Sequence, residues 1–303
     1  MSDRSSRLWR RRLVNHLRRQ GLVHEPRVED AFLDVPREVF VPETFAGEGL
    51  VAVYRDDAIV TRRDPETKAA LSSSSQPAIM AIMLEMLDLH PGHRVLEIGA
   101  GTGYNAAIVE RLVGPRGLVA SIDIDVDTVA RAAAALRSIG SRVGLVVADG
   151  VPGLPGLRGS GKPADRMVVT ASTAVIPCSW HQQLVDGGRL VVPVRLSDEV
   201  ERAHAVTAFE KVAAGFDSVT VTSGGFMPLR SYDGSMFGPA GPASSLTATP
   251  TPVDGGGESP FAQVTREEMD CLVITVRYDQ EPPKTRWRLD RGDHWIGVDT
   301  AES

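Results

Sequence analysis

Residues 95–104 constrain the fold more than any other stretch of the chain. They read Val-Leu-Glu-Ile and then Gly-Ala-Gly-Thr-Gly-Tyr, so a short apolar run ends in Ile98 and leads directly into three glycines at alternate positions. A bounded apolar run of this kind is typical of a buried strand. Glycine permits the positive φ values that a tight strand-to-helix turn requires. The stretch therefore predicts a strand, a turn and a helix start, the building unit of a parallel α/β sheet.

The same alternation continues on the carboxyl side of this turn. Apolar, β-branched runs predict strands at residues 94–98, 118–122, 143–147, 166–170 and 189–194. Helical spacing predicts helices at 105–113, 128–139 and 178–185. Residues 206–209 and 219–222 are expected to add an antiparallel pair at the sheet edge. The fold class predicted is α/β, with a doubly wound, mostly parallel, Rossmann-like sheet.

Composition divides the chain into four regions. Residues 1–70 are expected to be helical, beginning with an amphipathic helix over residues 1–20, where arginines alternate with Leu13, Val14 and Leu17. Residues 71–236 form the predicted catalytic domain. Residues 237–260 are rich in Pro, Gly, Ser and Thr and predict a linker. Residues 261–303 predict a small β-rich appendage, with a strand at 272–278 and a hairpin at 287–299.

Several classes of partner are not expected. The formal net charge is −6 and the charged fraction is 24%, without the basic excess of a nucleic-acid-binding protein. No long apolar stretch or small-residue cleavage site is present, so we expect no membrane span and a cytoplasmic location. Cys178 and Cys271 lie far apart without companion ligands, so no metal site or disulfide is expected.

The glycine turn is expected to bind a cofactor. Gly99, Gly101 and Gly103 do not follow the G-x-G-x-x-G spacing of dinucleotide sites, because the third glycine of that pattern would fall at Tyr104. A glycine turn can bring backbone N–H groups and a helix start close to a ligand. The alternative is that the turn is only a tight connection.

Three acids mark the carboxyl ends of successive predicted strands, where open parallel sheets bind ligands. They are Glu97, Asp123 and Asp149, the last followed by Gly150. We expect Asp123 to accept hydrogen bonds from ribose hydroxyls and Asp149 to meet an adenine amino group. Acids at strand ends are also common helix caps. Asp125 or Asp127 could cap the helix that begins near residue 128.

Over residues 13–230 the sequence resembles the protein-L-isoaspartate O-methyltransferases. The matching motifs follow one another in order: residues 35–42 (Val-Pro-Arg-Glu-Val-Phe-Val-Pro), 75–77 (Ser-Gln-Pro), 149–150 (Asp-Gly), 169–172 (Val-Thr-Ala-Ser), 176–177 (Ile-Pro), 187–194 (Gly-Gly-Arg-Leu-Val-Val-Pro-Val) and 226–229 (Phe-Met-Pro-Leu). The resemblance implies S-adenosyl-L-methionine as cofactor. It also implies that the acceptor is a carboxyl group on a protein or peptide.

By the same resemblance, Ser75 lies beside the sulfonium methyl group and orients the acceptor carboxylate. The implied pocket around the acceptor is formed by Ser74, Gln76, Thr170, Ala171 and Ser172. A carboxylate is already ionised at neutral pH, so methyl transfer needs alignment and exclusion of water but no general base. The alternative for Ser75 is a helix cap before Pro77, since serine is a favoured cap.

Two departures from the family pattern leave the substrate open. Ser72, Ser73 and Ser74 stand where the family has Thr-Ile before its serine, and residues 171–174 read Ala-Ser-Thr-Ala instead of small-Ala-Pro. The acceptor is therefore either damaged L-isoaspartate in proteins or an ordinary aspartate in a ribosomally made peptide, whose ester closes to an aspartimide. A small-molecule O- or N-methyltransferase, a non-catalytic binding module and a nucleic-acid methyltransferase are less well matched. The oligomeric state is not predicted.

Overall fold

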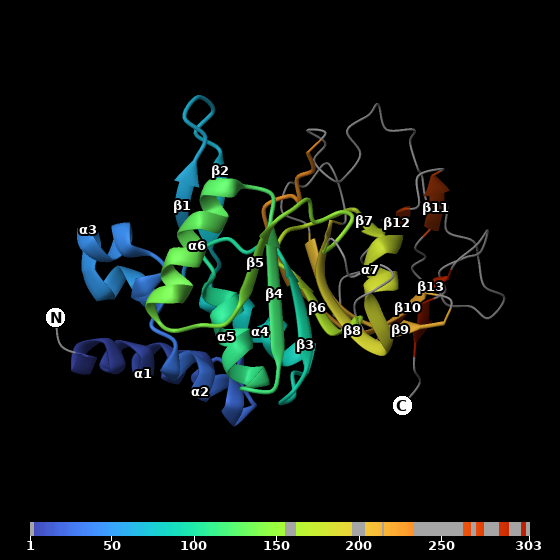
Figure 1. Cartoon of the computed structure of the whole chain (residues 1–303). Helices are drawn as coiled ribbons and strands as arrows, with labels where there is room; N and C mark the ends of the chain where they lie inside the picture. Colours follow the sequence, from blue (N-terminus) through green and yellow to red (C-terminus); the bar gives the residue numbers. More distant parts are fainter. Residues whose placement is uncertain are drawn as a thin grey trace. The chain divides into compact units, whose positions relative to one another are not determined.

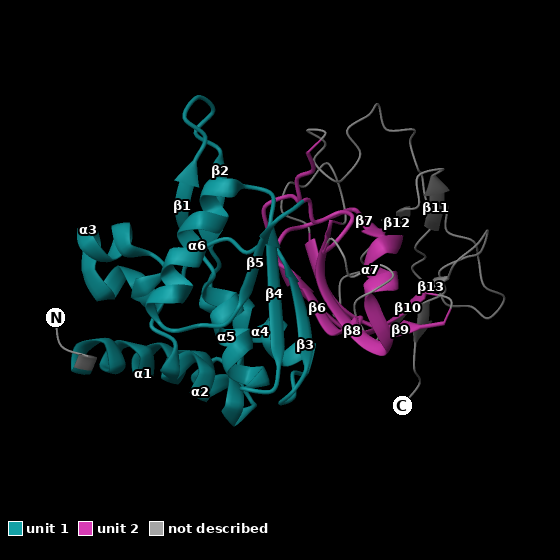
Figure 2. Ribbon diagram, viewed as in Figure 1, with its two compact units in different colours: residues 1–148 teal, residues 149–303 magenta. Residues whose placement is uncertain are grey.

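The computed structural model describes residues 3–154, 162–195, 204–213 and 215–232, and the backbone of four later strands, at 263–267, 271–275, 285–290 and 298–300. The chain divides into two compact units, residues 1–148 and residues 149–303 (Figure 2). The first unit contains the N-terminal helices, a β-hairpin and three parallel strands. Among its described residues, the second contains the remaining strands and one short helix (Figure 1).

The first unit is built around the parallel strands β3 (Arg94–Ile98), β4 (Leu118–Asp123) and β5 (Gly144–Val147). β3 pairs with β4, and β4 pairs with β5. Each crossover passes through one helix, first α5 (Tyr104–Val113) and then α6 (Val126–Ser138) (Figure 1). The last four residues of β3 are buried, as expected for a strand covered on both faces. The predicted parallel α/β arrangement is confirmed in this unit.

Four helical elements precede the first strand of the chain: α1 (Asp3–Arg19), α2 (Pro26–Asp34), the 3₁₀ turn η1 (Arg37–Val39) and α3 (Pro42–Val53). The predicted amphipathic N-terminal helix is confirmed as α1. Its apolar face is buried through Leu13, Val14 and Leu17. The guanidinium of Arg12 lies over the Trp9 ring, 4.6 Å from its centroid, which shields part of the exposed side of the helix.

A β-hairpin that the sequence pattern did not predict follows α3. It consists of β1 (Ile59–Arg63) and β2 (Ala70–Ser74), paired antiparallel, with a register irregularity between Val60 and Arg62. The helix α4 (Pro77–Leu87) begins three residues after β2. The hairpin therefore leads the chain directly into the Ser75-Gln76-Pro77 segment.

The second unit contains β6 (Ala164–Val169), β7 (Val175–Pro177), α7 (Cys178–Gln183), β8 (Leu184–Arg195), β9 (His204–Val212) and β10 (Gly215–Gly224). β6 and β8 are parallel, whereas β8–β9 and β9–β10 are antiparallel. The predicted strands at 166–170 and 189–194 and the predicted antiparallel pair are confirmed. The pair does not lie at the sheet edge as predicted, because a later strand, at residues 285–290, pairs with β10. β8 starts earlier than predicted because the chain passes from α7 into the strand without a loop.

The last strands are β11 (Gln263–Glu267), β12 (Cys271–Thr275), β13 (Thr285–Asp290) and β14 (Val298–Thr300). β12 pairs with β7, and β13 pairs with both β10 and β14. The predicted strand at 272–278 corresponds to β12, and the predicted hairpin at 287–299 to β13 and β14. The predicted linker at 237–260 lies outside the described residues. The division of the chain into a catalytic domain, a linker and an appendage stays a prediction.

Among the described residues, none of the helices has the length and apolar character needed to span a bilayer. The same residues contain no cluster of His, Cys, Asp and Glu side chains that could hold a metal ion.

Candidate active site

The glycine turn between β3 and α5 brings the chain close to two neighbouring elements of the first unit. Gly103 has φ +86°, and a Cβ atom there would lie 3.2 Å from the Cβ of Ala132 in α6. Gly101 has φ +51°, and a Cβ atom there would lie 3.1 Å from the carbonyl oxygen of Ser73 in β2. Both positions need glycine for its backbone freedom and for the space. The turn therefore contacts the strand that leads to Ser75.

The backbone donors of this turn are bound within the protein itself. The N–H groups of Gly99 and Ala100 both donate to the Ile122 carbonyl oxygen, over 2.8 and 3.0 Å. The Gly103 N–H donates to the Ala100 carbonyl oxygen over 2.8 Å. The expectation that this turn presents its N–H groups to a ligand is therefore corrected for these three residues. That the glycines at 99, 101 and 103 contact the cofactor stays a prediction.

Glu97 occupies the inside of the unit. Its side chain is fully buried, and its carboxylate accepts hydrogen bonds from Asn105 Nδ2, over 2.8 Å, and from the Ser121 hydroxyl. Burial raises the pKa of Glu97 to about 7, and the two hydrogen bonds oppose that rise. These contacts connect β3 to α5 and β4. Glu97 thus stabilises the packing of the elements around the turn. Its direct contact with a cofactor stays a prediction.

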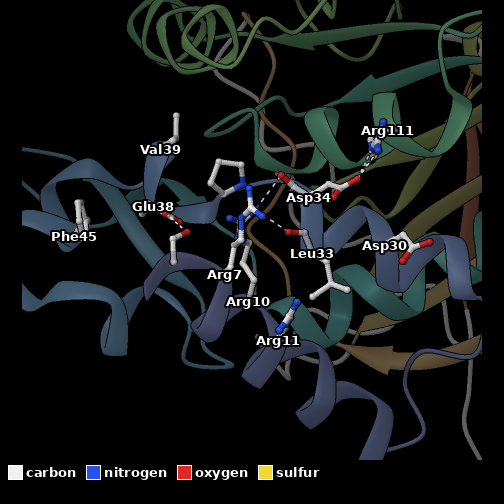
Figure 3. Close-up of a pocket in the computed structure, with 12 residues that line it drawn as sticks. Arg7, Arg10, Arg11, Asp30, Leu33, Asp34, Glu38, Val39, Phe45 and Arg111 are labelled. Carbon is white, nitrogen blue, oxygen red and sulfur yellow. Dashed lines mark hydrogen bonds and ion pairs between the residues drawn. The ribbon is translucent and has the colours of Figure 1, made fainter. Parts of the chain in front are cut away.

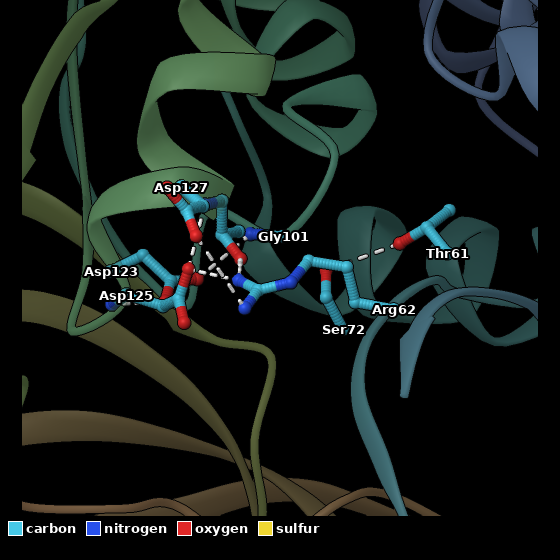
Figure 4. Close-up of polar contacts among 8 residues, drawn as sticks. Thr61, Arg62, Ser72, Gly101, Asp123, Asp125 and Asp127 are labelled. Carbon is cyan, nitrogen blue, oxygen red and sulfur yellow. Dashed lines mark hydrogen bonds and ion pairs between the residues drawn. The ribbon is translucent and has the colours of Figure 1, made fainter. Parts of the chain in front are cut away.

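Asp123 ends β4 and connects the turn to the next helix (Figure 4). Its Oδ2 accepts a hydrogen bond from the Gly101 N–H over 3.0 Å, and its Oδ1 accepts one from the Asp125 N–H over 3.1 Å. The side chain is half-buried. Each carboxylate oxygen has a second lone-pair site. The geometry is compatible with the predicted ribose contact, which stays a prediction.

Asp125 is the N-cap of α6, one of the two alternatives that the sequence left open. Its carboxylate accepts a hydrogen bond from the Thr128 N–H over 2.7 Å. Burial raises the pKa of Asp125 and is the largest single influence on it. The hydrogen bonds to Thr128 and Arg62 together outweigh burial, so the pKa is lowered. The charged form is therefore the one that caps the helix.

Ser75 is half-buried and lies between the end of β2 and the start of α4. It does not cap α4, because the N-cap position is Gln76, which makes no side-chain cap hydrogen bond. The cap comes from Asp56 instead, whose Oδ1 accepts a hydrogen bond from the Ala78 N–H over 2.8 Å. The capping alternative for Ser75 is therefore wrong. Among the described residues, its hydroxyl has no hydrogen-bond partner.

Arg37 holds the backbone around Ser75 in place. It is fully buried, and its Nη2 donates to the carbonyl oxygens of Ser75 and Asp57, each over 3.0 Å. Its Nη1 donates to the carbonyl oxygens of Val53 and Arg55, over 2.9 and 3.1 Å. Burial lowers the pKa of Arg37, but a guanidinium remains protonated in proteins. A buried cation thus joins the end of α3 to both ends of the hairpin.

Two predicted pocket residues of this segment, Ser74 and Gln76, form hydrogen bonds with Arg37 and Asp56. Ser74 is buried, and its hydroxyl accepts a hydrogen bond from Arg37 Nε over 3.4 Å. Gln76 Nε2 donates to the carbonyl oxygen of Asp56 over 3.1 Å. Their roles in binding an acceptor stay predictions. Arg37 belongs to a motif of the family resemblance, but neither it nor Asp56 has a local pattern that reveals its contacts.

In the second unit, Asp149 and Gly150 form a local cluster. Asp149 Oδ1 accepts from the Val151 N–H over 2.9 Å, and its Oδ2 accepts from the Tyr232 N–H over 3.0 Å and from the Ser231 hydroxyl. The Gly150 carbonyl oxygen accepts from Trp180 Nε1 over 2.8 Å. Asp149 thus holds the segment around residue 231, and its predicted contact with adenine stays a prediction.

The predicted pocket residues 170–172 follow β6. Thr170 and Ala171 are half-buried, and Ser172 is buried. The Ser172 N–H donates to the Met227 carbonyl oxygen and its carbonyl oxygen accepts from the Leu229 N–H, each over 2.8 Å. Two motifs of the resemblance, far apart in the sequence, therefore pair through their backbones. Contact of residues 170–172 with an acceptor stays a prediction.

A cavity of about 910 Å³ lies in the first unit among α1, α2, η1, α3 and α5 (Figure 3). Several of its charged side chains bind to the protein itself: Arg111 pairs with Asp34, and Arg10 Nη1 donates to the carbonyl oxygens of Leu33 and Asp34. None of its lining residues belongs to the glycine turn or to the Ser75 segment. We therefore do not assign it to the active site.

Comparison with known proteins decides the family. The family model for protein-L-isoaspartate (D-aspartate) O-methyltransferase matches residues 8–233, about three quarters of the chain. The chain belongs to this family. Two similar relatives, both named protein-L-isoaspartate O-methyltransferase, come from Thermotoga maritima and Methanopyrus kandleri. They are 37% identical over 185 residues and 39% identical over 194 residues, or 61% and 63% of this chain. The matched region spans 55% of the Thermotoga protein and 79% of the Methanopyrus protein.

Solved structures of the protein-L-isoaspartate O-methyltransferase family share the fold. One superposes with a TM-score of 0.70 at 25% identity and covers 97% of this chain and 100% of its own. A second, from Plasmodium falciparum and in complex with S-adenosyl-L-homocysteine, has a TM-score of 0.59 at 18% identity and covers 72% of this chain and 96% of its own. The S-adenosylmethionine-dependent methyltransferase fold predicted from the sequence is therefore confirmed.

Proposed function

We propose that this protein is an S-adenosyl-L-methionine-dependent carboxyl O-methyltransferase that acts on L-isoaspartyl or aspartyl side chains of proteins or peptides. Family membership supports the reaction class. One structural observation supports the assignment most directly: the strand that leads to Ser75 contacts the glycine turn, where a Cβ atom on Gly101 would lie 3.1 Å from the Ser73 carbonyl oxygen. A cofactor held at the turn and an acceptor held at Ser75 would therefore be neighbours.

The turn and the end of β4 would hold the cofactor. Gly99, Gly101 and Gly103 would lie against the cofactor, and Asp123 would accept hydrogen bonds from the ribose hydroxyls. When bound, S-adenosylmethionine supplies an electrophilic methyl group on a sulfonium centre. Asp149 and Gly150 would meet the adenine, as the resemblance implies.

Ser75 would position the acceptor carboxylate. Its hydroxyl can donate a hydrogen bond because capping of α4 is left to Asp56. A carboxylate oxygen then attacks the methyl carbon, a C–O bond forms, and the S–C bond breaks with its electron pair returning to sulfur. The products are a methyl ester and S-adenosylhomocysteine. No proton moves in this step, so the chain needs alignment and exclusion of water and not a general base.

The acceptor proposed is L-isoaspartate, which is named in the family and in the similar relatives. The methyl ester can then close to a succinimide, when the following backbone nitrogen displaces methanol. Modification of an ordinary aspartate in a ribosomally made peptide, giving an aspartimide, is the second candidate. It rests on the sequence alone, because serines stand at 72–74 where the family has Thr-Ile. We place the activity in the cytoplasm, since two cysteines far apart fit a reducing compartment.

A peptide assay tests the proposal. The full chain is incubated with S-adenosylmethionine and three peptides that share one sequence and carry L-isoaspartate, L-aspartate or asparagine at a single position. Intact mass reports addition of one methyl group. Methylation of the isoaspartyl peptide alone supports protein repair, and methylation of the aspartyl peptide supports peptide tailoring. If S-adenosylhomocysteine binds but no peptide is methylated, carboxyl transfer to peptides is refuted and a small-molecule acceptor is favoured.

A further inference from the structure

The β1–β2 hairpin is attached to the proposed cofactor site at a second point, through Arg62 (Figure 4). Arg62 lies in β1, and its Nη1 donates a hydrogen bond to Asp125 Oδ1 and another to the Thr128 hydroxyl, the latter over 3.2 Å. Its Nη2 lies 3.8 Å from the carboxylate of Asp127. The side chains of Arg62 and Asp125 are 24% and 22% exposed, so solvent screens this ion pair only in part.

These contacts close a ring around Asp123. From Arg62 the ring passes to Asp125, whose N–H binds one oxygen of Asp123, while the other oxygen of Asp123 binds the Gly101 N–H. Gly101 lies close to the Ser73 carbonyl oxygen, which a Cβ atom at Gly101 would approach to 3.1 Å, and Ser73 pairs with Val60 in the same hairpin as Arg62. Both strands of the hairpin are thus fixed to the elements on either side of the proposed ribose-binding carboxylate.

We propose that Arg62 is a positioning residue that sets the location of Ser75 relative to the bound cofactor. This inference rests on the proposed function. Ser75 follows β2 directly, so any movement of the hairpin on the turn is transmitted to it. Arg37 fixes the carbonyl oxygen of Ser75 to the N-terminal helices, and Arg62 fixes the hairpin to the cofactor-binding strand end. Methyl transfer requires in-line geometry, and a displacement of about 1 Å can lower its rate by as much as about 100-fold.

Replacement of the Arg62 guanidinium should therefore reduce turnover more than cofactor affinity. In Arg62→Met, Asp123 keeps its bonds to Gly101 and Asp125, and Asp125 keeps its bond to the Thr128 N–H. We expect kcat for the methylated peptide to fall about 10- to 100-fold. The Kd for S-adenosylhomocysteine should change less than about 3-fold, because the carboxylate itself is untouched.

The matched control is Arg63→Met. Arg63 is the next residue of β1, is exposed, and donates to the Lys68 carbonyl oxygen within the hairpin. Its kcat should stay within about 2-fold of the wild type, as for surface substitutions away from special contacts. Asp125→Asn keeps a good capping side chain but loses the charge that binds Arg62. The double variant Arg62→Met/Asp125→Asn should then be no slower than the slower single variant, because both remove one interaction.

A second measurement is independent of turnover. Amide hydrogen exchange of residues 59–74 should be faster in Arg62→Met than in the wild type and unchanged for α5, if Arg62 holds the hairpin on the turn. Turnover within about 2-fold of the wild type, additive losses in the double variant, or unchanged exchange of the hairpin would each overturn the inference. A wild-type protein that methylates no peptide would refute the proposed function instead, and hairpin exchange would still decide whether Arg62 anchors it.

Discussion

Arg37→Met tests how strongly the Ser75 segment depends on one buried cation. The substitution keeps an unbranched side chain of lower polarity and removes all five N–H donors of the guanidinium. Four backbone carbonyl oxygens, those of Val53, Arg55, Asp57 and Ser75, lose a donor, and so does the Ser74 hydroxyl. No buried charge is left behind, so the cost comes from the acceptors that stay unsatisfied.

The loss can be estimated from these contacts. A hydrogen bond from a charged donor contributes about 1.5 to 3 kcal/mol, but the five bonds share a single desolvated cation and are not additive. A buried acceptor left unsatisfied costs about 1 to 3 kcal/mol, and because the acceptors can partly relax we take about 3 to 5 kcal/mol for the whole set. For a chain of this size, each kcal/mol lowers the Tm by about 2 to 4 °C, so we expect a decrease of roughly 6 to 20 °C. Arg37→Lys should lose less, because it keeps the charge and three donors.

Arg10→Met is the control for a general effect of losing a buried arginine. Arg10 is 6% exposed, and its Nη1 donates to the carbonyl oxygens of Leu33 and Asp34 in α2, which lie outside the Ser75 segment. Both variants should unfold at lower temperature in thermal denaturation followed by circular dichroism. Only Arg37→Met should also lower kcat per folded molecule, measured well below its Tm with the methylated peptide. Equal kcat in the two variants would show that Arg37 stabilises the fold without positioning Ser75.

Three further substitutions test individual residues of the site. Asp123→Ala should weaken binding of S-adenosylmethionine by about 1.5 to 3 kcal/mol, the scale of charge-assisted hydrogen bonds, and unchanged affinity by calorimetry would exclude the ribose contact. Ser75→Ala should lower kcat by about 10-fold or more with nearly unchanged cofactor affinity, whereas loss of binding with normal turnover per bound enzyme would make Ser75 structural. The pKa of Glu97 is raised to about 7, so its stabilising contribution is complete below about pH 4.5 and is lost as the pH rises to about 7. In the wild type the free energy of unfolding, measured with urea, should therefore fall by about 2 to 3 kcal/mol between pH 5 and pH 8, and in Glu97→Gln this decrease should be absent. Parallel pH profiles for the two proteins would contradict the assignment.

The parallel core could be predicted because its signals are local. β3 was predicted with its observed bounds, since its apolar run ends at the glycine turn, and α5 began only one residue earlier than expected. The β1–β2 hairpin was missed because its strands are polar and half-exposed, so they lack the alternation that indicates a strand. The hairpin is also held by Arg37 and Arg62, whose hydrogen bonds join residues that are distant in the sequence. No window of neighbouring residues contains that information.

The capping alternative that the structure excludes for Ser75 shows how the fold leaves its hydroxyl available for an acceptor. A serine before Gln-Pro at a helix start is a strong capping pattern, and a capping serine would use its oxygen to accept from the helix backbone. Here Asp56, 22 residues before Ala78, accepts that bond, and Arg37 binds the Ser75 carbonyl oxygen. The backbone of Ser75 is thus fixed while its hydroxyl makes no hydrogen bond among the described residues. A rigid backbone with an uncommitted donor is what alignment of a carboxylate requires, because neither the position nor the hydrogen bond has to be released from another partner first.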